Sequence, residues 1–411
     1  MRSLLPGLLG AALLAIGPPA PFVEEDGRAP TPAELRPGVE AAFEQESYRP
    51  GSIATLAVFG APGRFTYRVY RSGPETAPTR GDDELAGVPV TAPATGVGAT
   101  RIRVGDWPSG LYFARLESAF GLAGFAPFVV APRRLGEHRV AVVLPTLTWQ
   151  AYNLRDGGSW YASWSVRTVH VGRPFLDRGV PPNYRRYDLP FLHWLARTGW
   201  QVDVLADADL DAVPSGEALA RAYDLVVFPG HHEYVTDHEY DVVRRYRDLG
   251  GHLAFLSAND FFWRVVRHGG TFERTSRWRD VGRPEASLIG VQYRANDRGT
   301  HRAPWIVRAA PAGAWLFAGT GLAPGAAFES GGIEIDATSP ASPPGVQVLA
   351  EIPDLFGAGF TAQMTYYETP AGAEVFAAGA FRLVTEPLSP VVSQLLHNLW
   401  LRMATPRKES T

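Results

Sequence analysis

The sequence contains no cysteine among its 411 residues. This absence excludes a disulfide framework, a thiolate zinc site, an iron–sulfur cluster and a cysteine nucleophile. Any metal ion must therefore be held by oxygen or by imidazole nitrogen. Charge of one sign is also lacking, since the formal net charge is only −3. That balance gives no electrostatic reason to expect nucleic acid or an anionic membrane surface as a partner.

Long hydrophobic runs are missing as well, apart from a short one at the N-terminus. Arg2 precedes an apolar run over residues 4–16, and small residues follow at 17–20. This order is typical of a secretory signal, so we predict a leader over residues 1–22 and an exported or cell-envelope protein, with a cytoplasmic location as the alternative. The run is too short, and too interrupted by proline and glycine, to span a membrane. No later segment qualifies, so no integral membrane span is expected.

The first part of the chain is predicted to be built of β-strands. Hydrophobic residues make up 45% of the sequence, which is typical of a globular protein, and the length favours two or three domains. From residue 38 to residue 132, alternating apolar stretches are separated by turns rich in proline, glycine and acidic residues. The clearest stretches are 52–59, 65–70, 100–104 and 111–116. Short strands at this spacing predict a small β-sandwich domain over residues 38–132.

From residue 137 onward, apolar runs alternate with helical patterns. The runs show little alternation, as expected of strands buried on both faces, and lie at 139–145, 201–206, 224–230 and 252–259. Helical spacing of apolar residues occurs at 188–198, 215–222 and 237–249. The N-cap candidates are Asp188, Ser215 and either Thr236 or Asp237, and the C-terminal stops are Gly199 and Gly250-Gly251. This alternation predicts an α/β domain with a parallel sheet and helices on its faces.

The last part of the chain is interpreted as a β-rich extension of that domain, which then covers residues 137–404. Strands are expected at 288–293, 305–309, 346–352, 362–368 and 374–379. A helix over 390–403 is expected to follow them, with Ser389 as its N-cap and Pro390 at its first position.

Polar residues follow each of the four predicted parallel strands. The segments are 146–153 after the first strand, Asp207 after the second, 231–234 after the third and 257–260 after the fourth. In open α/β sheets, ligands bind beyond the carboxyl ends of the strands, so these residues should meet at one edge. Asp207 is interpreted as a turn residue, and the remaining segments predict a functional site.

The exit of the third strand, Gly230-His231-His232-Glu233-Tyr234, carries the most chemistry. A strand, tight turn and helix is where hydrolases and amidotransferases often present a nucleophile, yet no serine or cysteine is present here. His231 and Glu233 are instead metal ligands or proton-transfer groups. The alternative is a solvated polar loop that caps the next helix. Similarly, Tyr152 is either functional or an aromatic lid, and Asn259 either caps a helix or orients a carbonyl or a bound water.

Together, these segments resemble the catalytic C-terminal region of the N,N-dimethylformamidase large-subunit family. The matching stretches are 107–112, 148–153, 157–159, 188–192, 223–234 and 257–260. They extend over nearly the whole chain after the leader. The resemblance implies a glutamine-amidotransferase-like, flavodoxin-like α/β domain that lacks the usual cysteine.

The resemblance also implies a mononuclear Fe(III) held by two tyrosines and one glutamate. Carried over by motif, the ligands are Tyr112, Tyr152 and Glu233, with His231 and Asn259 beside the bound water and the substrate. Ferric iron is a hard cation that suits phenolate and carboxylate oxygen, and it can polarise an amide carbonyl and activate water. His231 is expected to move protons to the leaving amine, and Asn259 to donate to the developing oxyanion. The expected function is iron-dependent hydrolysis of small linear, formamide-type amides.

Several expectations accompany this hypothesis. Because Tyr112 belongs to the β-sandwich, the site is predicted at the junction of the two domains. The expected partner is a small-molecule amide substrate, and a homo-oligomer or a small partner subunit is also possible. Two alternatives stay open: a zinc-dependent hydrolase that uses Glu233 with His231, His232 or His238, and an exported, non-catalytic ligand-binding protein of the same fold.

Overall fold

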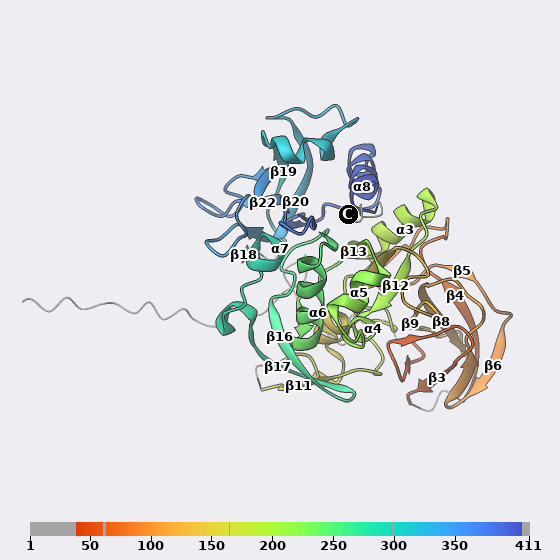
Figure 1. Ribbon diagram of the computed structural model, residues 1–411. Helices are drawn as coiled ribbons and strands as arrows, with labels where there is room; N and C mark the ends of the chain where they lie inside the picture. The colour runs from red at the N-terminus through yellow and green to blue at the C-terminus, as the bar shows by residue number, and fades with distance from the viewer. Residues whose placement is uncertain (1–37, 61–62, 164, 298, 405–411) are drawn as a thin grey trace, which may run out of the picture.

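Two facing sheets of short strands form the N-terminal part of the computed structural model, which describes residues 38–404 apart from 61–62, 164 and 298 (Figure 1). The leader predicted at 1–22 lies outside the described residues. One sheet contains β1 (Ala41–Phe43), β3 (Ile53–Val58) and β7 (Thr100–Arg103). The other contains β2 (Ser47–Tyr48), β9 (Ala123–Val130), β8 (Gly110–Ser118), β4 (Arg64–Arg71), β5 (Val88–Pro89) and β6 (Ala94–Val97). Phe43, Leu56 and Phe128 pack in the core between these two sheets.

The rest of the chain is organised around an eleven-stranded sheet. Its parallel half has the order β12 (Asp203–Ala206), β10 (Val140–Leu144), β13 (Leu225–Phe228), β15 (His252–Phe255) and β23 (Glu374–Ala377). Its antiparallel half continues through β22 (Ala362–Glu368), β21 (Gln347–Ile352), β19 (Arg302–Val307), β20 (Ala327–Ala337) and β18 (Gln292–Asn296), with β24 (Ala380–Phe381) beside β20. The strands late in the sequence therefore extend the parallel sheet by hydrogen bonding.

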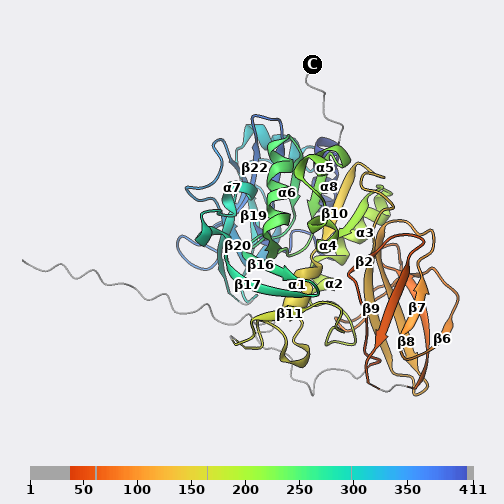
Figure 2. The same cartoon turned by 60° about the horizontal axis from the view of Figure 1, so that its bottom comes forward.

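Helices cover both faces of the large sheet (Figures 1 and 2). One face packs against α3 (Leu189–Thr198) and α8 (Pro390–Met403), and the other against α4 (Asp207–Asp211), α5 (Gly216–Ala222), α6 (Asp237–Asp248) and α7 (Ala286–Ile289). Along β10, Val142 faces the first layer and Val143 the second. Because both faces of each central strand are covered, these strands contain apolar residues at successive positions instead of alternating polar ones.

A separate four-stranded sheet that the sequence did not predict lies beside the parallel half. It has the order β11 (Thr168–His170), β17 (Thr271–Arg277), β16 (Trp263–His268) and β14 (Tyr234–Thr236). The remaining helical turns are α1 (Thr146–Tyr152), η1 (Arg155–Gly157), α2 (Tyr184–Tyr187), η2 (Trp278–Val281) and η3 (Pro311–Phe317). Tyr234 on β14 and Leu147 on α1 share one hydrophobic cluster, which holds this small sheet against the beginning of the α/β region.

Most of the predicted helix ends are confirmed. The side chains of Ser215, Thr236 and Ser389 each accept a hydrogen bond from a backbone N–H in the first turn of α5, α6 and α8. Gly199 ends α3 with a φ of 73°, a left-handed conformation that suits glycine. Within the described residues, no helix combines the length and the hydrophobicity needed to cross a bilayer.

Three local predictions hold only in part. Asp188 lies at the predicted N-cap position of α3 but makes no side-chain capping bond, because its carboxyl group accepts from the Trp149 indole instead. The strand expected at 288–293 begins only at Gln292, after the left-handed Gly290, because its first residues belong to α7. Asp207 is more than a turn residue, since it begins α4 and its carboxylate caps α1.

Candidate active site

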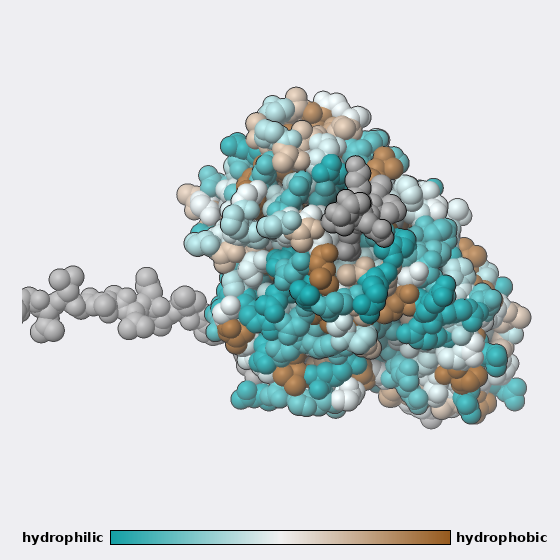
Figure 3. Space-filling view, in the orientation of Figure 1, coloured by the Kyte–Doolittle hydropathy of each residue, from teal (hydrophilic) through white to brown (hydrophobic). Residues whose placement is uncertain are grey.

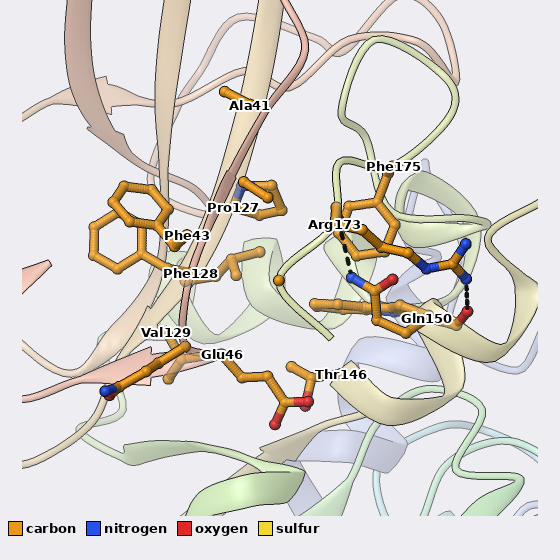
Figure 4. A pocket seen from close by; sticks show the side chains of 15 residues that line it. Ala41, Phe43, Glu46, Pro127, Phe128, Val129, Thr146, Gln150, Arg173 and Phe175 are labelled. Atoms are coloured by element: carbon orange, nitrogen blue, oxygen red, sulfur yellow. Dashed lines mark hydrogen bonds between the residues drawn. The ribbon is translucent and has the colours of Figure 1, made fainter. Parts of the chain in front are cut away.

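Helix α1 is held at both ends, and this fixes Tyr152, its last residue. At the start, Asp207 Oδ2 accepts from the Leu147 backbone N–H at 2.7 Å. At the end, the Arg173 guanidinium donates to the carbonyl oxygens of Gln150 and Asn153, at 2.8 and 2.9 Å. Figure 4 shows Arg173 against Gln150, on the wall of a cavity of about 40 Å³ between the β-sandwich and α1. Fixed carbonyls leave α1 little freedom to unwind near the site.

The loop after β13 is bound to α1 and to the loop after β15. Thr148 Oγ1 accepts from the backbone N–H of Glu233 at 3.1 Å. The backbone N–H of His232 donates to Asp260 Oδ1 at 2.9 Å. Gly230 is required for close approach, because a Cβ at this position would collide with Asp188 Oδ1. These contacts fix the segment that carries the candidate catalytic side chains.

Tyrosine hydroxyls converge on the Glu233 carboxylate. Tyr152 and Tyr161 both donate to Glu233 Oε2, at 2.6 and 2.8 Å, and their rings stack with centroids 4.3 Å apart. The Tyr161 hydroxyl also lies 2.6 Å from that of Tyr234. Glu233 and Tyr234 are buried, whereas Tyr152 and Tyr161 are only partly buried, so solvent reaches part of these two tyrosines.

The phenols of this cluster are held protonated. Burial, and then the nearby Glu233 charge, raise the pKa of Tyr152, Tyr161 and Tyr234 well above the usual value. Both causes act against the phenolate form, because a buried negative charge beside a second one is unfavourable. A cation placed among these oxygens would reverse the balance and favour deprotonation.

His231 adjoins the same carboxylate. Its Nδ1 lies 3.1 Å from the Ala258 carbonyl, to which it donates, so Nε2 is directed to Glu233 Oε2 at 3.3 Å and to the Tyr152 hydroxyl at 3.2 Å. Burial acts to lower the pKa of His231, but Glu233 and the nearby acidic side chain of Glu334 outweigh it and raise the pKa to about 9. His231 is therefore protonated near neutral pH and can donate a proton.

Asn259 and two acidic residues of β20 complete the polar lining. Asn259 Nδ2 donates to Glu233 Oε1 at 3.4 Å, and its backbone N–H donates to Asp336 at 3.0 Å. Burial raises the pKa of Glu334 to about 8 and that of Asp336 to about 7. Asn259 has a φ of 55°, in the left-handed region that non-glycine residues rarely adopt and that often marks functional sites.

The structure does not place Tyr112 in this cluster. Its side chain is buried in the β-sandwich core, where it stacks on Trp107 and donates to the Pro108 carbonyl at 2.8 Å. Burial raises its pKa to about 12. Tyr161, which the sequence-based assignment omitted, stands beside Tyr152 and Glu233 instead. The cluster of Tyr152, Tyr161 and Glu233 lies within the α/β region, and the site predicted at the junction of the two domains stays a prediction.

Of the three histidines proposed for zinc, only His231 adjoins Glu233. His232 packs edge-on against Phe228, and burial lowers its pKa to about 3, so it is a neutral core residue. His238 lies on α6, and its Nε2 is 2.7 Å from the Val213 carbonyl. In the part of the chain that the structure describes, no three or more histidine, aspartate or glutamate side chains are arranged to hold a metal ion. The structure thus does not assemble the predicted zinc site.

Asp188 forms a second polar feature beside the cluster. It helps to line a cavity of about 10 Å³ together with Tyr152, Tyr187 and His231, which is room for about one water molecule. Its Oδ2 accepts from the Trp149 indole at 3.1 Å, while its Oδ1 has no hydrogen-bond partner among the described residues. Burial raises the pKa of Asp188 to about 8.

This raised pKa predicts a pH-dependent contribution to stability. The folded protein holds a proton on Asp188 that the unfolded chain releases near pH 4, so stability falls as the pH rises toward 8. Asp188→Asn keeps an acceptor for the Trp149 indole but cannot ionise. We expect the variant to exceed the parent by about 1–3 kcal/mol at pH 9 and to differ little at pH 4. Denaturant unfolding at the two pH values measures this; Asp106→Asn, at a side chain that is 86% exposed, is the control. Equal pH dependence in all three proteins would contradict the prediction.

Comparison with known proteins places the chain beside amide-degrading relatives. A sequence profile of the family described as N,N-dimethylformamidase beta subunit-like, C-terminal, matches residues 97–386. The N,N-dimethylformamidase beta subunit of Paracoccus aminophilus is 32% identical over 115 residues. That alignment covers 28% of this chain and only 15% of the relative.

Solved structures show weak likeness. A superoxide reductase (neelaredoxin) from Ignicoccus hospitalis is 11% identical with a TM-score of 0.16, and the match covers 23% of this chain and 82% of that one. A cycloisomaltooligosaccharide glucanotransferase from Paenibacillus, in complex with cycloisomaltoheptaose, is 11% identical with a TM-score of 0.19, and covers 53% of this chain and 48% of that one. Scores this low carry no argument about fold or function.

Proposed function

Because the chain belongs to the N,N-dimethylformamidase beta subunit-like family, we propose that it hydrolyses small linear amides at the cluster of Tyr152, Tyr161 and Glu233. The observation that carries the proposal is the convergence of two phenol hydroxyls on one oxygen of a buried carboxylate, beside a histidine that is protonated near neutral pH. The family match supports the reaction class, and the name of the Paracoccus relative supports a formamide-type substrate.

We further propose ferric iron as the cofactor, held by Tyr152, Tyr161 and Glu233. The donor set fits this ion, because phenolate and carboxylate oxygens are hard ligands and the chain has no thiolate to offer. The two phenol oxygens already lie within 3 Å of one carboxylate oxygen, at 2.6 and 2.8 Å. When bound there, the metal would supply a Lewis acid that polarises an amide carbonyl and lowers the pKa of water.

Three side chains around the proposed ligands have separate roles in catalysis. His231, oriented by its bond to the Ala258 carbonyl, delivers a proton from Nε2 to the leaving amine nitrogen. Glu334, whose Oε2 has no partner among the described residues, accepts the proton that the attacking water loses. Because burial raises the pKa of Glu334 to about 8, only its ionised fraction can do so, and that fraction grows as the pH rises toward 8. Asn259 donates its amide N–H to the carbonyl oxygen as negative charge develops there.

An assembly of several chains fits the comparison. The name of the Paracoccus relative marks that protein as one subunit of an enzyme. We propose that this chain also works as an oligomer or with a partner subunit.

Metal analysis joined to an amide assay tests the proposed function. We expect one iron per chain and a visible absorption band, because tyrosinate bound to ferric iron gives a charge-transfer colour. The iron-loaded protein should release ammonia from formamide and dimethylamine from N,N-dimethylformamide, and removal of iron by a chelator should abolish colour and turnover together. A colourless zinc protein that hydrolyses amides would refute the iron, and an iron protein without turnover on an amide panel would refute the reaction.

A further inference from the structure

Helix α3 lies between the large sheet and the β-sandwich, and its buried residues pack in one cluster with Leu111 and Phe113 of the sandwich (Figures 1 and 2). A groove of about 710 Å³ borders this helix, and its other walls are loop 73–79 of the sandwich, α2, the first residue of β19 and segment 382–386. On the face of the molecule shown in Figure 3, hydrophobic residues are scattered and form no continuous patch. Charged side chains, whose contacts change with pH, are therefore the clearer surface feature.

His193 on α3 joins the sandwich to the end of the α/β region. Its Nε2 lies 3.1 Å from Glu75 Oε1 in the sandwich loop, and its Nδ1 lies 3.0 Å from Glu386 Oε1, beyond β24. The His193 side chain is 13% exposed, that of Glu75 3% and that of Glu386 36%. The contact with Glu75 is thus largely withdrawn from water, which strengthens it electrostatically. One imidazole ring therefore connects three segments that are far apart in the sequence.

This arrangement of the imidazole requires its protonated form. Each ring nitrogen faces a carboxylate oxygen, and only the imidazolium has an N–H on both nitrogens. In the neutral ring, the lone pair of one nitrogen would face a negatively charged oxygen. Burial acts to lower the pKa of His193, but the hydrogen bonds to Glu75 and Glu386 outweigh it and raise the pKa above its usual value.

Other charged groups also face His193. Five arginines line the groove around it: Arg185, Arg186, Arg197, Arg302 and Arg382. Three of them are paired with carboxylates, since Asp82 binds the two on α2 and Glu386 binds the one on α3. The arginines disfavour a further positive charge, whereas the two carboxylates favour it. Because the carboxylates contact the imidazole directly, their effect is the larger.

The His193 contacts end close to the candidate active site. Segment 382–386 continues directly from Phe381, the last residue of β24. The Phe381 ring lies 4.8 Å from the ring of His231 and 4.8 Å from that of Tyr187. Loss of the bond between His193 and Glu386 would therefore release a segment that carries part of the wall beside His231.

We propose that His193 is a pH-dependent clamp, closed on Glu75 and Glu386 while its imidazole is protonated and released when a rise in pH removes that proton. The sign follows from the raised pKa in the folded state. The stabilising contribution is complete below the usual histidine value of 6.5 and is lost as the pH rises through the higher folded value. Release leaves the buried Glu75 carboxylate without this charged donor, so loop 73–79 and segment 382–386 loosen. The clamp does not depend on the reaction proposed above.

Hydrogen exchange measured by mass spectrometry at pH 6 and pH 8.5, corrected for the intrinsic exchange rate, tests the clamp. In the parent, protection of peptides over 73–79 and 382–386 should fall roughly tenfold between the two pH values, the factor expected for one charge-assisted hydrogen bond. His193→Gln cannot take up a proton and should exchange rapidly at both. His193→Arg is charged at both and should stay protected at both. His268→Gln, at a side chain that is 57% exposed, is the control and should behave like the parent.

An NMR titration of the histidine rings supplies a second, direct measurement. The His193 signal, identified by its loss in His193→Gln, should titrate above pH 6.5 in the parent and closer to 6.5 in Glu386→Gln, which lacks one of the two carboxylates. Because Asp188 titrates in every variant, the differences between variants decide the exchange experiment. Titration of His193 at or below pH 6.5, equal protection of the parent at both pH values, or parent-like pH dependence in His193→Gln would each overturn the clamp.

Discussion

Glu233→Gln is expected to lower amide hydrolysis by roughly a thousandfold or more while the chain stays folded. Glutamine preserves the shape of the side chain but removes the negative charge that accepts hydrogen bonds from Tyr152, Tyr161 and Asn259. If its NH₂ group took the place of Oε2, it could accept from neither tyrosine hydroxyl, because an amide NH₂ only donates. The loss is large because the same carboxylate orients the phenols, pairs with His231 and completes the proposed iron ligands.

The comparison needs kcat/KM, iron content and a test of folding for each protein. Near-UV circular dichroism should remain that of the parent, since the site contributes only part of the aromatic signal. Glu117→Gln is the matched control, because Glu117 pairs with Arg115 at 2.9 Å on a side chain that is 42% exposed. Surface pairs of this kind contribute little, so the control should retain full activity. A Glu233→Gln protein with normal iron and normal turnover would remove Glu233 from the site.

Adjacency in the parallel sheet explains why much of the site could be predicted. Tyr152 follows β10, Glu233 follows β13 and Asn259 follows β15, and these three strands are neighbours in the sheet. The carboxyl ends of parallel strands necessarily meet at one edge. Recognising the strands from their unbroken apolar runs was therefore enough to expect these side chains together. The catalytic and metal-binding roles assigned to them remain predictions.

The site residues that the sequence prediction missed lie in segments without a recognisable local pattern. Tyr161 stands in an irregular segment, and its bond to Glu233 joins residues 72 positions apart. Glu334 belongs to β20, in the antiparallel half of the sheet, where it enters the site from a strand far along the chain. One signal was present: two acidic residues alternate with isoleucine over 333–336, directly after two glycines. Acidic residues in a buried strand are uncommon and point to function.

The position of Tyr112 in the sandwich core follows from strand geometry. It lies on β8, where successive side chains point to opposite faces. Leu111 and Phe113 pack in the core shared with the α/β region, whereas Tyr112 points the other way, into the sandwich. A short sequence motif identifies the strand but does not show which of its faces meets the site. A shift of one residue decides whether a side chain points into the sandwich core or toward the α/β region.

Tyr161→Phe is expected to lose iron, the visible band and at least about a hundredfold in activity, whereas Tyr112→Phe keeps all three. The first substitution removes one of the two phenol oxygens beside Glu233 Oε2. The second removes only the bond to the Pro108 carbonyl, which should cost about 1 kcal/mol of stability. Both variants are purified side by side, and their iron content, absorption spectrum and formamide turnover are measured. These measurements decide which of the two tyrosines is an iron ligand.

Tyr234→Phe sharpens the same test. Its hydroxyl lies 2.6 Å from that of Tyr161, and it contacts the cluster through that phenol. Removing it should leave iron bound but shift the charge-transfer band, because Tyr161 loses a hydrogen-bond partner and its oxygen becomes a stronger donor to the metal.

If Tyr112→Phe bleached the protein while Tyr161→Phe did not, the ligand set carried over from the family motif would stand. Tyr161 would then support Tyr152 and Glu233 by hydrogen bonding, and these two residues would hold the iron together with Tyr112. If both variants bleached it, the metal would be bound by oxygens from both domains, and the sandwich core around Tyr112 would have to open for Tyr112 to reach the metal.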